Sequence, residues 1–252
     1  MFVPLHDENP LRHISRAYVT IGLIVVNCVA FLMEFSPVGR SVVASLAVIP
    51  SELFAAGPLG SVTLGPVDQV AIPEGLTLIT YMFLHGDPAH LIGNMLFLWV
   101  FGDNVEDAMG HVRFLFFYFI CGVVGGLVHA YAAEYGGAGA FIDDNMTRSA
   151  MGGVPLVGAS AAVAGVIAAY LMLHPRVRVW VLAFRFIPLR ISALLALGAW
   201  IATQFAMLLL PDTGPVAWWA HIGGIACGAL LIIFLRRPGV PLFDKPSATL
   251  TA

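Results

Sequence analysis

Hydrophobic residues occur along this chain in six long runs, separated by shorter polar or glycine- and proline-rich segments. An apolar helix needs roughly 20 residues to cross the hydrocarbon core of a bilayer. Six stretches reach or approach that length, namely 17–33, 89–107, 113–133, 159–173, 191–210 and 216–235. The pattern therefore predicts an all-α polytopic membrane protein with six transmembrane helices.

The composition excludes two other classes of protein. Of the 252 residues, 59% are hydrophobic and only 11% are charged, and the mean hydropathy is +0.89. A soluble domain carries about 25% charged residues, so this chain cannot cover a surface that faces water. The 12 Lys and Arg against 15 Asp and Glu leave no basic excess for nucleic acid. Cys28, Cys121 and Cys227 lie in apolar runs without metal-type spacing and indicate no redox compartment.

The basic residues predict the orientation of the six helices. If the N-terminus lies in the cytoplasm, ten basic residues fall on the inside and two on the outside, which accounts for all 12. Cytoplasmic segments of membrane proteins are enriched in Lys and Arg. We therefore expect a multi-pass protein of the cell membrane, with a cytoplasmic N-terminal segment (1–16), a membrane domain (17–235) and a cytoplasmic tail (236–252). The inside residues are Arg12, Arg16, Arg113, Arg176, Arg178, Arg185, Arg190, Arg236, Arg237 and Lys245.

The first run and the connections carry further expectations. Glu34 follows the first run directly, without the small residues of a cleavage site, so we expect an anchor rather than a signal peptide. Residues 34–88 are rich in Pro and Gly but not very polar, and we expect them to fold on or partly in the outer leaflet. Residues 134–158 are glycine-rich and predict a flexible lead into the fourth helix. Residues 174–190 hold four Arg and no acid, which favours the inner interface, as a hairpin or a helix.

Polar residues near the starts of the even-numbered helices are functional candidates, because ionisable and amide side chains are costly in a bilayer. They are His85, His90 and Asn94 in the second helical region, Ser160 in the fourth and His221 in the sixth. These helices all run from outside to inside. At 1.5 Å per residue, Asn94, Ser160 and His221 lie roughly 7–9 Å below the outer boundary. Three helices thus bring polar groups to one level.

Small residues on two of these helices permit a close approach. Gly224 and Gly228 lie on the face of His221, and the fourth helix carries Ala161 and Gly165. Small residues at such spacings allow two helix backbones to come together in a membrane. A serine nucleophile and a histidine base could then reach the separation of about 3 Å that catalysis requires.

The surroundings of Ser160 favour a negatively charged intermediate. Ser160 begins a helix, where free N–H groups and the helix dipole attract anions. His90 and Asn94 are four residues apart on one helical face, and both can donate hydrogen bonds to a developing oxyanion. The pattern indicates a nucleophile, a base and oxyanion donors.

Non-catalytic interpretations stand beside this one. A serine in a membrane helix commonly bonds its own backbone, and a single buried histidine is commonly structural. Asn27 and Gln204 are expected to be polar groups that pack helices. A metal site from His85, His90 and His221 would lack both an HExxH motif and a nearby carboxylate, so no metal is expected.

Four motifs together resemble those of the rhomboid intramembrane serine proteases. HGDPAHLIGN (85–94) is similar to the family's His-x4-His-x3-Asn, and GDNVEDAMG (102–110) to its Gly-x3-Glu-x3-Gly. GASAAVAG (158–165) resembles the Gly-x-Ser motif, and AHIGGIACG (220–228) the Ala-His-x2-Gly-x3-Gly motif. The resemblance runs from about residue 77 to residue 235. It implies a six-helix bundle whose long first outer loop is packed partly into the membrane.

The resemblance also implies roles for individual residues. Ser160 would be the nucleophile and His221 its base, a dyad without a third acid. His90, Asn94 and the backbone N–H of Ser160 would form the oxyanion hole. The remaining residues would be supporting ones, with Gly158 allowing the turn before the nucleophile, His85 ordering a loop, Glu106 acting structurally, and Gly224 and Gly228 packing the sixth helix.

The resemblance implies single-pass membrane proteins as substrates, membrane lipids as surroundings, and neither a cofactor nor nucleic acid. The Trp-Arg pair often found in the family's first outer loop is missing here, and LTLIT (76–80) occupies roughly that region. The main alternative is a catalytically inactive rhomboid-like protein that binds membrane helices, although such proteins typically lack the Ser or the His. A transporter and an aspartyl protease using Asp103 and Asp107 are less favoured, because the inner halves of the helices are apolar and these acids are not paired in the core.

Overall fold

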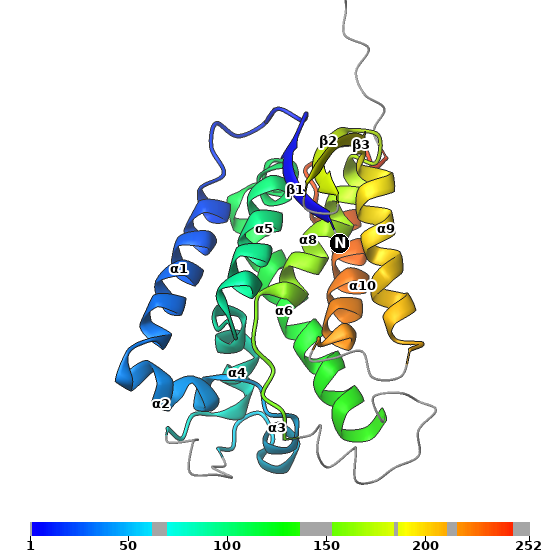
Figure 1. Ribbon diagram of the computed structural model, residues 1–252. Helices are drawn as coiled ribbons and strands as arrows, with labels where there is room; N and C mark the ends of the chain where they lie inside the picture. Colours follow the sequence, from blue (N-terminus) through cyan, green and yellow to red (C-terminus); the bar gives the residue numbers. More distant parts are fainter. Residues whose placement is uncertain (1, 62–69, 137–152, 184–185, 211–215, 244–252) are drawn as a thin grey trace, which may run out of the picture.

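The computed structural model describes residues 2–61, 70–136, 153–183, 186–210 and 216–243, and its architecture is mostly helical (Figure 1). Within these residues, each of the six apolar runs contains one long helix, at about the predicted position. The helices are α1 (Tyr18–Glu34), α5 (Pro88–Met109), α6 (His111–Tyr131), α8 (Ser160–Leu173), α9 (Ala193–Met207) and α10 (Trp218–Leu235). One π-helical turn, η2 (Ala132–Gly136), extends α6.

Two of these helices are long and apolar enough to cross a membrane by length and composition alone. They are α6 with its extension, over His111–Tyr135, and α10. The helices α1, α8 and α9 are apolar but shorter, at 10–17 residues. Helix α5 has 22 residues, but acidic side chains occupy its last two turns. The structure thus supports the assignment of the chain as a membrane protein. That it crosses the membrane six times stays a prediction.

A small antiparallel sheet corrects the expectation of an all-α chain. Strands β1 (Phe2–Asp7), β2 (Arg178–Ala183) and β3 (Ile187–Ser192) pair in the order β1-β2-β3. Segment 174–190, for which the sequence left hairpin and helix open, belongs to the β2–β3 hairpin. Along β2, buried Val179 and Val181 alternate with exposed Arg178 and Trp180, the two-residue period of a strand packed on one face. Strand β1 was not predicted, because its pairing with β2 joins distant segments.

The described part of the long connection after α1 is largely helical, while its position at the outer leaflet stays a prediction. It contains α2 (Pro37–Leu46), α3 (Pro50–Ala56), α4 (Glu74–Thr80) and the 3-10 turn η1 (Tyr81–Phe83). Helices α2 and α3 each begin with proline, whose fixed backbone angle suits the first helical position. An isolated bridge between Val48 and Leu156 ties this region to the segment that leads into α8. Most of the glycine-rich segment 134–158 lies outside the described residues.

Helix α8 lies at the centre of the bundle and is buried on nearly every side. A helix that is apolar all round belongs in the interior rather than at a surface. It contacts α5, α6 and α10, and in Figure 1 it stands among the longer helices. The other elements therefore determine the position of Ser160, the first residue of α8.

Glycines let α8 and α10 meet backbone to backbone. A Cβ atom at Gly224 would overlap the carbonyl oxygen of Ala161, and one at Gly228 would overlap that of Gly165. Helix α6 comes equally near, since a Cβ at Gly125 would lie 2.6 Å from the carbonyl oxygen of Ala220. No side chain larger than hydrogen fits at these positions without separating the helices.

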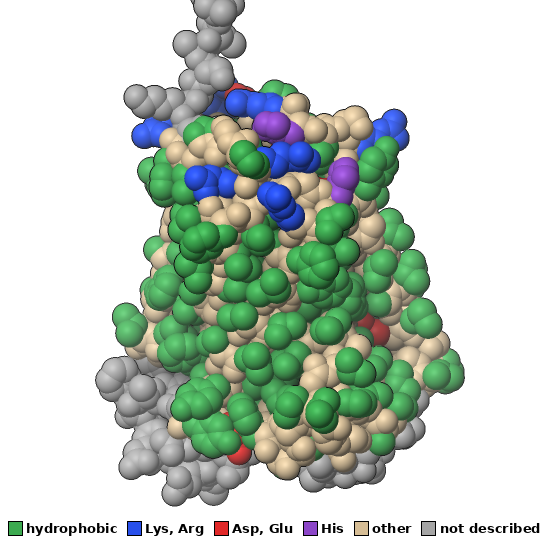
Figure 2. All heavy atoms as spheres, turned by 180° about the vertical axis from the view of Figure 1, so that it is seen from behind, with side chains coloured by type: hydrophobic (Ala, Val, Ile, Leu, Met, Phe, Trp, Pro, Cys, Tyr) green, Lys and Arg blue, Asp and Glu red, His purple; other side chains and the backbone are tan. Residues whose placement is uncertain are grey.

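Most of the described arginines gather at one end of the bundle, which we name the arginine end (Figure 2). This end holds the sheet, the starts of α1 and α6, and the ends of α5, α8 and α10, while α2–α4 lie at the opposite end (Figure 1). Its described arginines are Arg12, Arg16, Arg113, Arg176, Arg178, Arg190, Arg236 and Arg237. All were predicted to share one side of the membrane.

A buried carboxyl attaches β1 to the helices at the arginine end. Oδ2 of Asp7 accepts hydrogen bonds from Tyr170 Oη at 2.6 Å and from Asn104 Nδ2 at 3.1 Å. Burial raises the pKa of Asp7 to about 7, although the Tyr170 hydrogen bond opposes this shift, and the nearby Asp103 adds to it. The carboxyl of Asp7 thus keeps its proton in the folded protein at mildly acidic pH.

Replacing Gly228 by alanine is expected to destabilise the protein by about 1–3 kcal/mol or more, the usual effect of overpacking, because the added methyl group meets the Gly165 carbonyl. The measurement is thermal unfolding in detergent. Gly198→Ala in α9 is the matched control, since a Cβ there has no neighbour within 4 Å. Equal melting temperatures for both variants would contradict the close approach of α8 and α10.

Asp7 predicts a pH-dependent stability. Below its ordinary pKa of 3.8, both folded and unfolded chains are protonated at Asp7. Between 3.8 and about 7 only the folded chain holds this proton, so the free energy of unfolding falls as pH rises, by at most about 4 kcal/mol. Unfolding measured from pH 4.5 to 7.5 should show this slope in the wild type and a flatter one in Asp7→Asn. Identical slopes would exclude the effect.

Candidate active site

The turn before α8 presents Ser160. Gly158 has φ +121°, a conformation that favours glycine, and its N–H donates to the carbonyl of Tyr81 at 2.9 Å. A Cβ at Gly158 would also lie 2.6 Å from Cε1 and 2.7 Å from Nε2 of His90. Two separate constraints therefore require glycine at position 158, namely the backbone angle and the close packing of the His90 ring.

His221 meets Ser160 across the α8–α10 contact. Its Nε2 lies 2.9 Å from Ser160 Oγ. His221 is in the first turn of α10 and only 8% exposed, whereas Ser160 is half-buried. The structure thus brings together the two residues that the sequence predicted as nucleophile and base.

Gln204, in the last turn of α9, contacts the other nitrogen of this imidazole. Its Oε1 lies 2.7 Å from His221 Nδ1, and its Nε2 donates to the carbonyl of Trp200 at 3.0 Å. Because the amide oxygen only accepts, Nδ1 of His221 carries the hydrogen. Nε2 is then the unprotonated nitrogen of the neutral ring, and its lone pair faces the Ser160 hydroxyl.

The sequence analysis missed this contact, because it treated Gln204 as a polar group that packs helices. A signal was available, since an amide in the last turn of the fifth predicted helix would lie at the same level as a histidine in the first turn of the sixth. The sequence does not show which partner such an amide selects. The other residue interpreted in this way, Asn27, donates to the carbonyl of Leu23 in its own helix at 2.8 Å.

Two tryptophan rings pack near the imidazole. The rings of Trp200 and Trp218 both have centroids 6.0 Å from that of His221, at interplanar angles of 34° and 87°. Bulky apolar rings at this distance limit rotation of the histidine side chain and keep its surroundings poor in water.

His90 and Asn94 lie beside Gly158, two residues before Ser160 in the chain. Asp87 caps α5 by accepting the N–H of His90 at 2.9 Å, and this capped start carries both side chains. A Cβ built at Gly158 would lie 3.8 Å from Asn94 Nδ2, and the His90 ring is closer still. The predicted oxyanion donors therefore lie beside the turn that leads into Ser160.

His85 supports this cluster from the preceding loop. Its Nε2 lies 3.1 Å from Asn94 Nδ2, and its ring stands 5.1 Å from the ring of His90 at 67°. Its backbone N–H donates to Glu34 Oε1, at the end of α1, at 3.1 Å. These contacts order the loop around Asn94 and agree with the supporting role that the motif implies.

Glu106 lies at the arginine end of α5, far along the helix from Asn94. Its carboxylate accepts the backbone N–H groups of Val19 at 3.0 Å and Thr20 at 2.8 Å. It also accepts the Thr20 hydroxyl at 2.7 Å and lies 2.5 Å from His111 Nδ1. One buried carboxylate thus connects α1, α5 and α6, an arrangement suited to holding helices together.

The site has the parts of a hydrolase that uses a serine nucleophile. A neutral imidazole faces an alcohol, an amide orients the imidazole, and the alcohol begins a helix whose first N–H groups have no acceptor within the helix. The neighbouring His90 and Asn94 can donate to an oxygen that gains negative charge. Such a set can activate a hydroxyl for attack on a carbonyl carbon.

Comparison with known proteins points to one family. The model of the rhomboid domain matches residues 73–238, which include the four motifs. The chain is 29% identical over 234 residues to RHOMBOID-like protein 12, mitochondrial, of Arabidopsis thaliana, covering 90% of this chain and 61% of the relative. It is 31% identical over 169 residues to RHOMBOID-like protein 1 of the same plant, covering 67% and 36%.

A third similar protein is Rhomboid protein 1, mitochondrial, of Saccharomyces cerevisiae, at 28% identity over 159 residues, 63% of this chain and 41% of that protein. The chain thus spans less than two thirds of the length of these relatives. The domain match covers well over half of the chain and contains both Ser160 and His221. The protein therefore belongs to the rhomboid family.

Proposed function

We propose that this membrane protein is a serine endopeptidase that cleaves single-pass membrane proteins within or next to their transmembrane segments. The observation that carries the proposal is the 2.9 Å contact between His221 Nε2 and Ser160 Oγ, with Gln204 holding the imidazole as the base-competent tautomer. Family membership supports the same activity. An inactive family member that only binds membrane helices would need neither the contact between Ser160 and His221 nor a particular tautomer of His221.

In the proposed reaction His221 acts as a general base. Its Nε2 takes the proton of Ser160 while Oγ attacks the carbonyl carbon of the scissile peptide bond. The same nitrogen then donates this proton to the leaving amine, and the acyl group remains on Ser160. A water molecule, activated in turn by Nε2, hydrolyses the ester and restores the hydroxyl.

Three donors are proposed to stabilise the tetrahedral oxyanion. They are the side chains of His90 and Asn94 and the backbone N–H of Ser160. The N–H of Gly158 does not take part, because it donates to Tyr81. The amide nitrogen of Asn94 carries two hydrogens, so its contact with His85 leaves one for the oxyanion. One such donor contributes about 3–4 kcal/mol to transition-state stabilisation.

Gln204 is proposed as the positioning residue of the dyad. It holds Nδ1–H and thereby selects the tautomer whose Nε2 accepts the serine proton. A neutral amide also avoids the large penalty of burying an unpaired carboxylate in an apolar region. The amide cannot neutralise an imidazolium as a carboxylate would, so its contribution is one of orientation.

The proposed placement in the membrane follows from the two ends of the bundle. The arginine end would face the cytoplasm, with both termini there, and the site would open to the opposite side as a hydrated pocket. The proposal keeps six spans within 17–235, with cytoplasmic segments 1–16 and 236–252. A substrate helix must unwind to expose a carbonyl, which favours segments weakened by Gly or Pro.

Replacement of Ser160 by alanine is expected to abolish cleavage of a model transmembrane substrate and covalent labelling by a fluorophosphonate, because both need the serine oxygen. Labelling of the wild type, mapped by peptide analysis to Ser160, separates an active enzyme from an inactive helix-binding protein. Unchanged thermal unfolding controls for folding. A wild type that neither cleaves nor labels would contradict the proposed function.

Gln204→Leu and Gln204→Glu form a matched pair, since both keep the approximate shape of glutamine and only glutamate keeps an acceptor. The leucine variant is expected to slow fluorophosphonate labelling about tenfold, the scale of one neutral hydrogen bond. The glutamate variant, which keeps an acceptor for Nδ1–H of His221, is expected to be labelled faster than the leucine variant. If the leucine variant were labelled at the wild-type rate, Gln204 would have no part in the mechanism.

A further inference from the structure

A second polar region lies at the arginine end, remote from Ser160. It is an open pocket of about 590 Å³ between the end of α5, the start of α6 and the segment after α10. Two arginines and two histidines line it, and no acidic residue does. The lining residues are His13, Met109, Gly110, His111, Val112, Arg113, Arg237 and Pro238.

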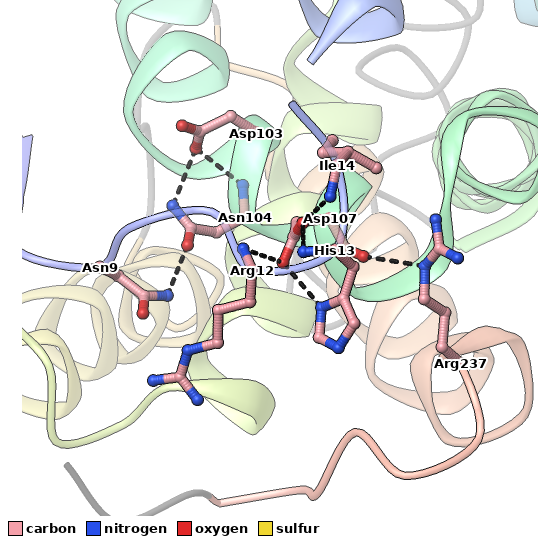
Figure 3. Close-up of polar contacts among 8 residues, drawn as sticks. All are labelled: Asn9, Arg12, His13, Ile14, Asp103, Asn104, Asp107 and Arg237. Atoms are coloured by element: carbon pink, nitrogen blue, oxygen red, sulfur yellow. Dashed lines mark hydrogen bonds and ion pairs between the residues drawn. The ribbon is translucent and has the colours of Figure 1, made fainter. Parts of the chain in front are cut away.

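Hydrogen bonds to helix ends hold the two arginines in place. Arg237 donates through Nε to the carbonyl of Asp107 at 3.1 Å (Figure 3). Its backbone N–H donates to the carbonyl of Ala108 at 2.7 Å. Arg113 reaches from α6 to α10, where Nη1 lies 3.4 Å from the carbonyl of Leu235. Each of these contacts uses one nitrogen of a guanidinium, which has five N–H donors. Donors therefore remain on both groups for an anion.

The two histidines are held through Nδ1. His13 Nδ1 lies 3.0 Å from Asp107 Oδ2 (Figure 3), and His111 Nδ1 lies 2.5 Å from Glu106 Oε1. These contacts leave the Nε2 atoms of both rings for other partners.

The nearby carboxylates are already occupied by protein donors. Asp107 accepts the backbone N–H groups of Arg12, His13 and Ile14, at 3.1, 2.7 and 2.7 Å. Glu106 is satisfied by α1, as described above. Asp107 therefore binds the N-terminal segment and Glu106 binds α1 and His111, and neither forms an ion pair with Arg113 or Arg237 within the described residues. The guanidinium groups of Arg113 and Arg237 are therefore not paired with these carboxylates.

The surface next to the pocket is apolar. Val112 in the pocket wall is 68% exposed, and Phe116 on α6 and Phe234 on α10 are 63% and 72% exposed. In a membrane protein these side chains face acyl chains, not water. The pocket thus has cationic donors, at the level of lipid headgroups, beside an apolar surface. This arrangement is complementary to a phospholipid, which has an anionic headgroup and apolar acyl chains.

We propose that this pocket binds the headgroup of an anionic phospholipid. The phosphodiester would accept hydrogen bonds from Arg113 and Arg237, and an acyl chain would lie along the exposed residues of α6 and α10. The bound lipid would connect the start of α6 to the segment after α10. This inference is independent of the proposed protease activity, since the pocket contains no residue of the active site.

The test is lipid binding by the full chain, measured by native mass spectrometry in neutral detergent with added phosphatidylglycerol or phosphatidylcholine. The wild type is expected to prefer phosphatidylglycerol. One arginine near a membrane surface contributes about fivefold in affinity, so Arg113→Gln should weaken phosphatidylglycerol binding about fivefold, and Arg113→Gln with Arg237→Gln about 30-fold. Because Arg237 also contacts α5, the single Arg113 variant decides the question if the double variant does not fold.

Arg178→Gln is the matched control, since it removes one exposed positive charge at the same end but outside the pocket. It is expected to keep wild-type affinity. Equal weakening by Arg178→Gln and Arg113→Gln would show general charge attraction and overturn the proposal, as would equal binding of both lipids by the wild type. Inorganic phosphate that competes fully with phosphatidylglycerol would assign the pocket to a soluble anion and also overturn it.

Discussion

The contact between the backbones of α8 and α10 is the constraint on which the rest of the site depends. Ser160 and His221 are 61 residues apart, and their side chains are short, so they can meet only if the two helix axes come unusually close. Gly224 and Gly228 remove the side chains that would keep the axes apart. In a membrane this packing is favoured by dispersion contacts between complementary surfaces, because lipid chains compete for any apolar surface.

The imidazole of His221 has a neutral polar partner on each side in this apolar setting. His221 is bonded on both nitrogens, to a hydroxyl and to an amide, and no net charge is buried in the resting site. In the proposed reaction charge would develop only during attack, next to donors that are already oriented, which would reduce the reorganisation needed at the transition state. Avoidance of buried charge also explains why an amide rather than a carboxylate lies beside the imidazole, since a buried unpaired carboxylate is strongly destabilising.

At the arginine end, polar contacts connect the ends of several helices. The carboxylate of Asp107 accepts backbone N–H groups of the N-terminal segment, that of Glu106 accepts N–H groups at the start of α1, and the guanidinium of Arg237 donates to a carbonyl at the end of α5. Strand β1 adds Asp7 to the same polar region. The first residues of the chain thus lie across the helix ends and are hydrogen-bonded to them. The remaining N–H donors of Arg113 and Arg237 face outward.

Much of this protein follows from the sequence by itself. Long apolar runs locate the six main helices, because burial in lipid needs length and hydrophobicity that few other structures require. Polar residues at one depth, with small residues beside them, single out Ser160, His90, Asn94 and His221, since the cost of polar groups in a bilayer makes each one conspicuous.

Only the tertiary structure decides which of these groups touch. The pairing of Gln204 with His221, the three-stranded sheet that includes β1, and the pocket between α5, α6 and the segment after α10 each join segments distant in the chain. Periodicity and hydropathy are local properties, whereas a hydrogen bond between two helices depends on their relative rotation and separation. That information resides in side-chain packing across the bundle, which a single sequence does not display.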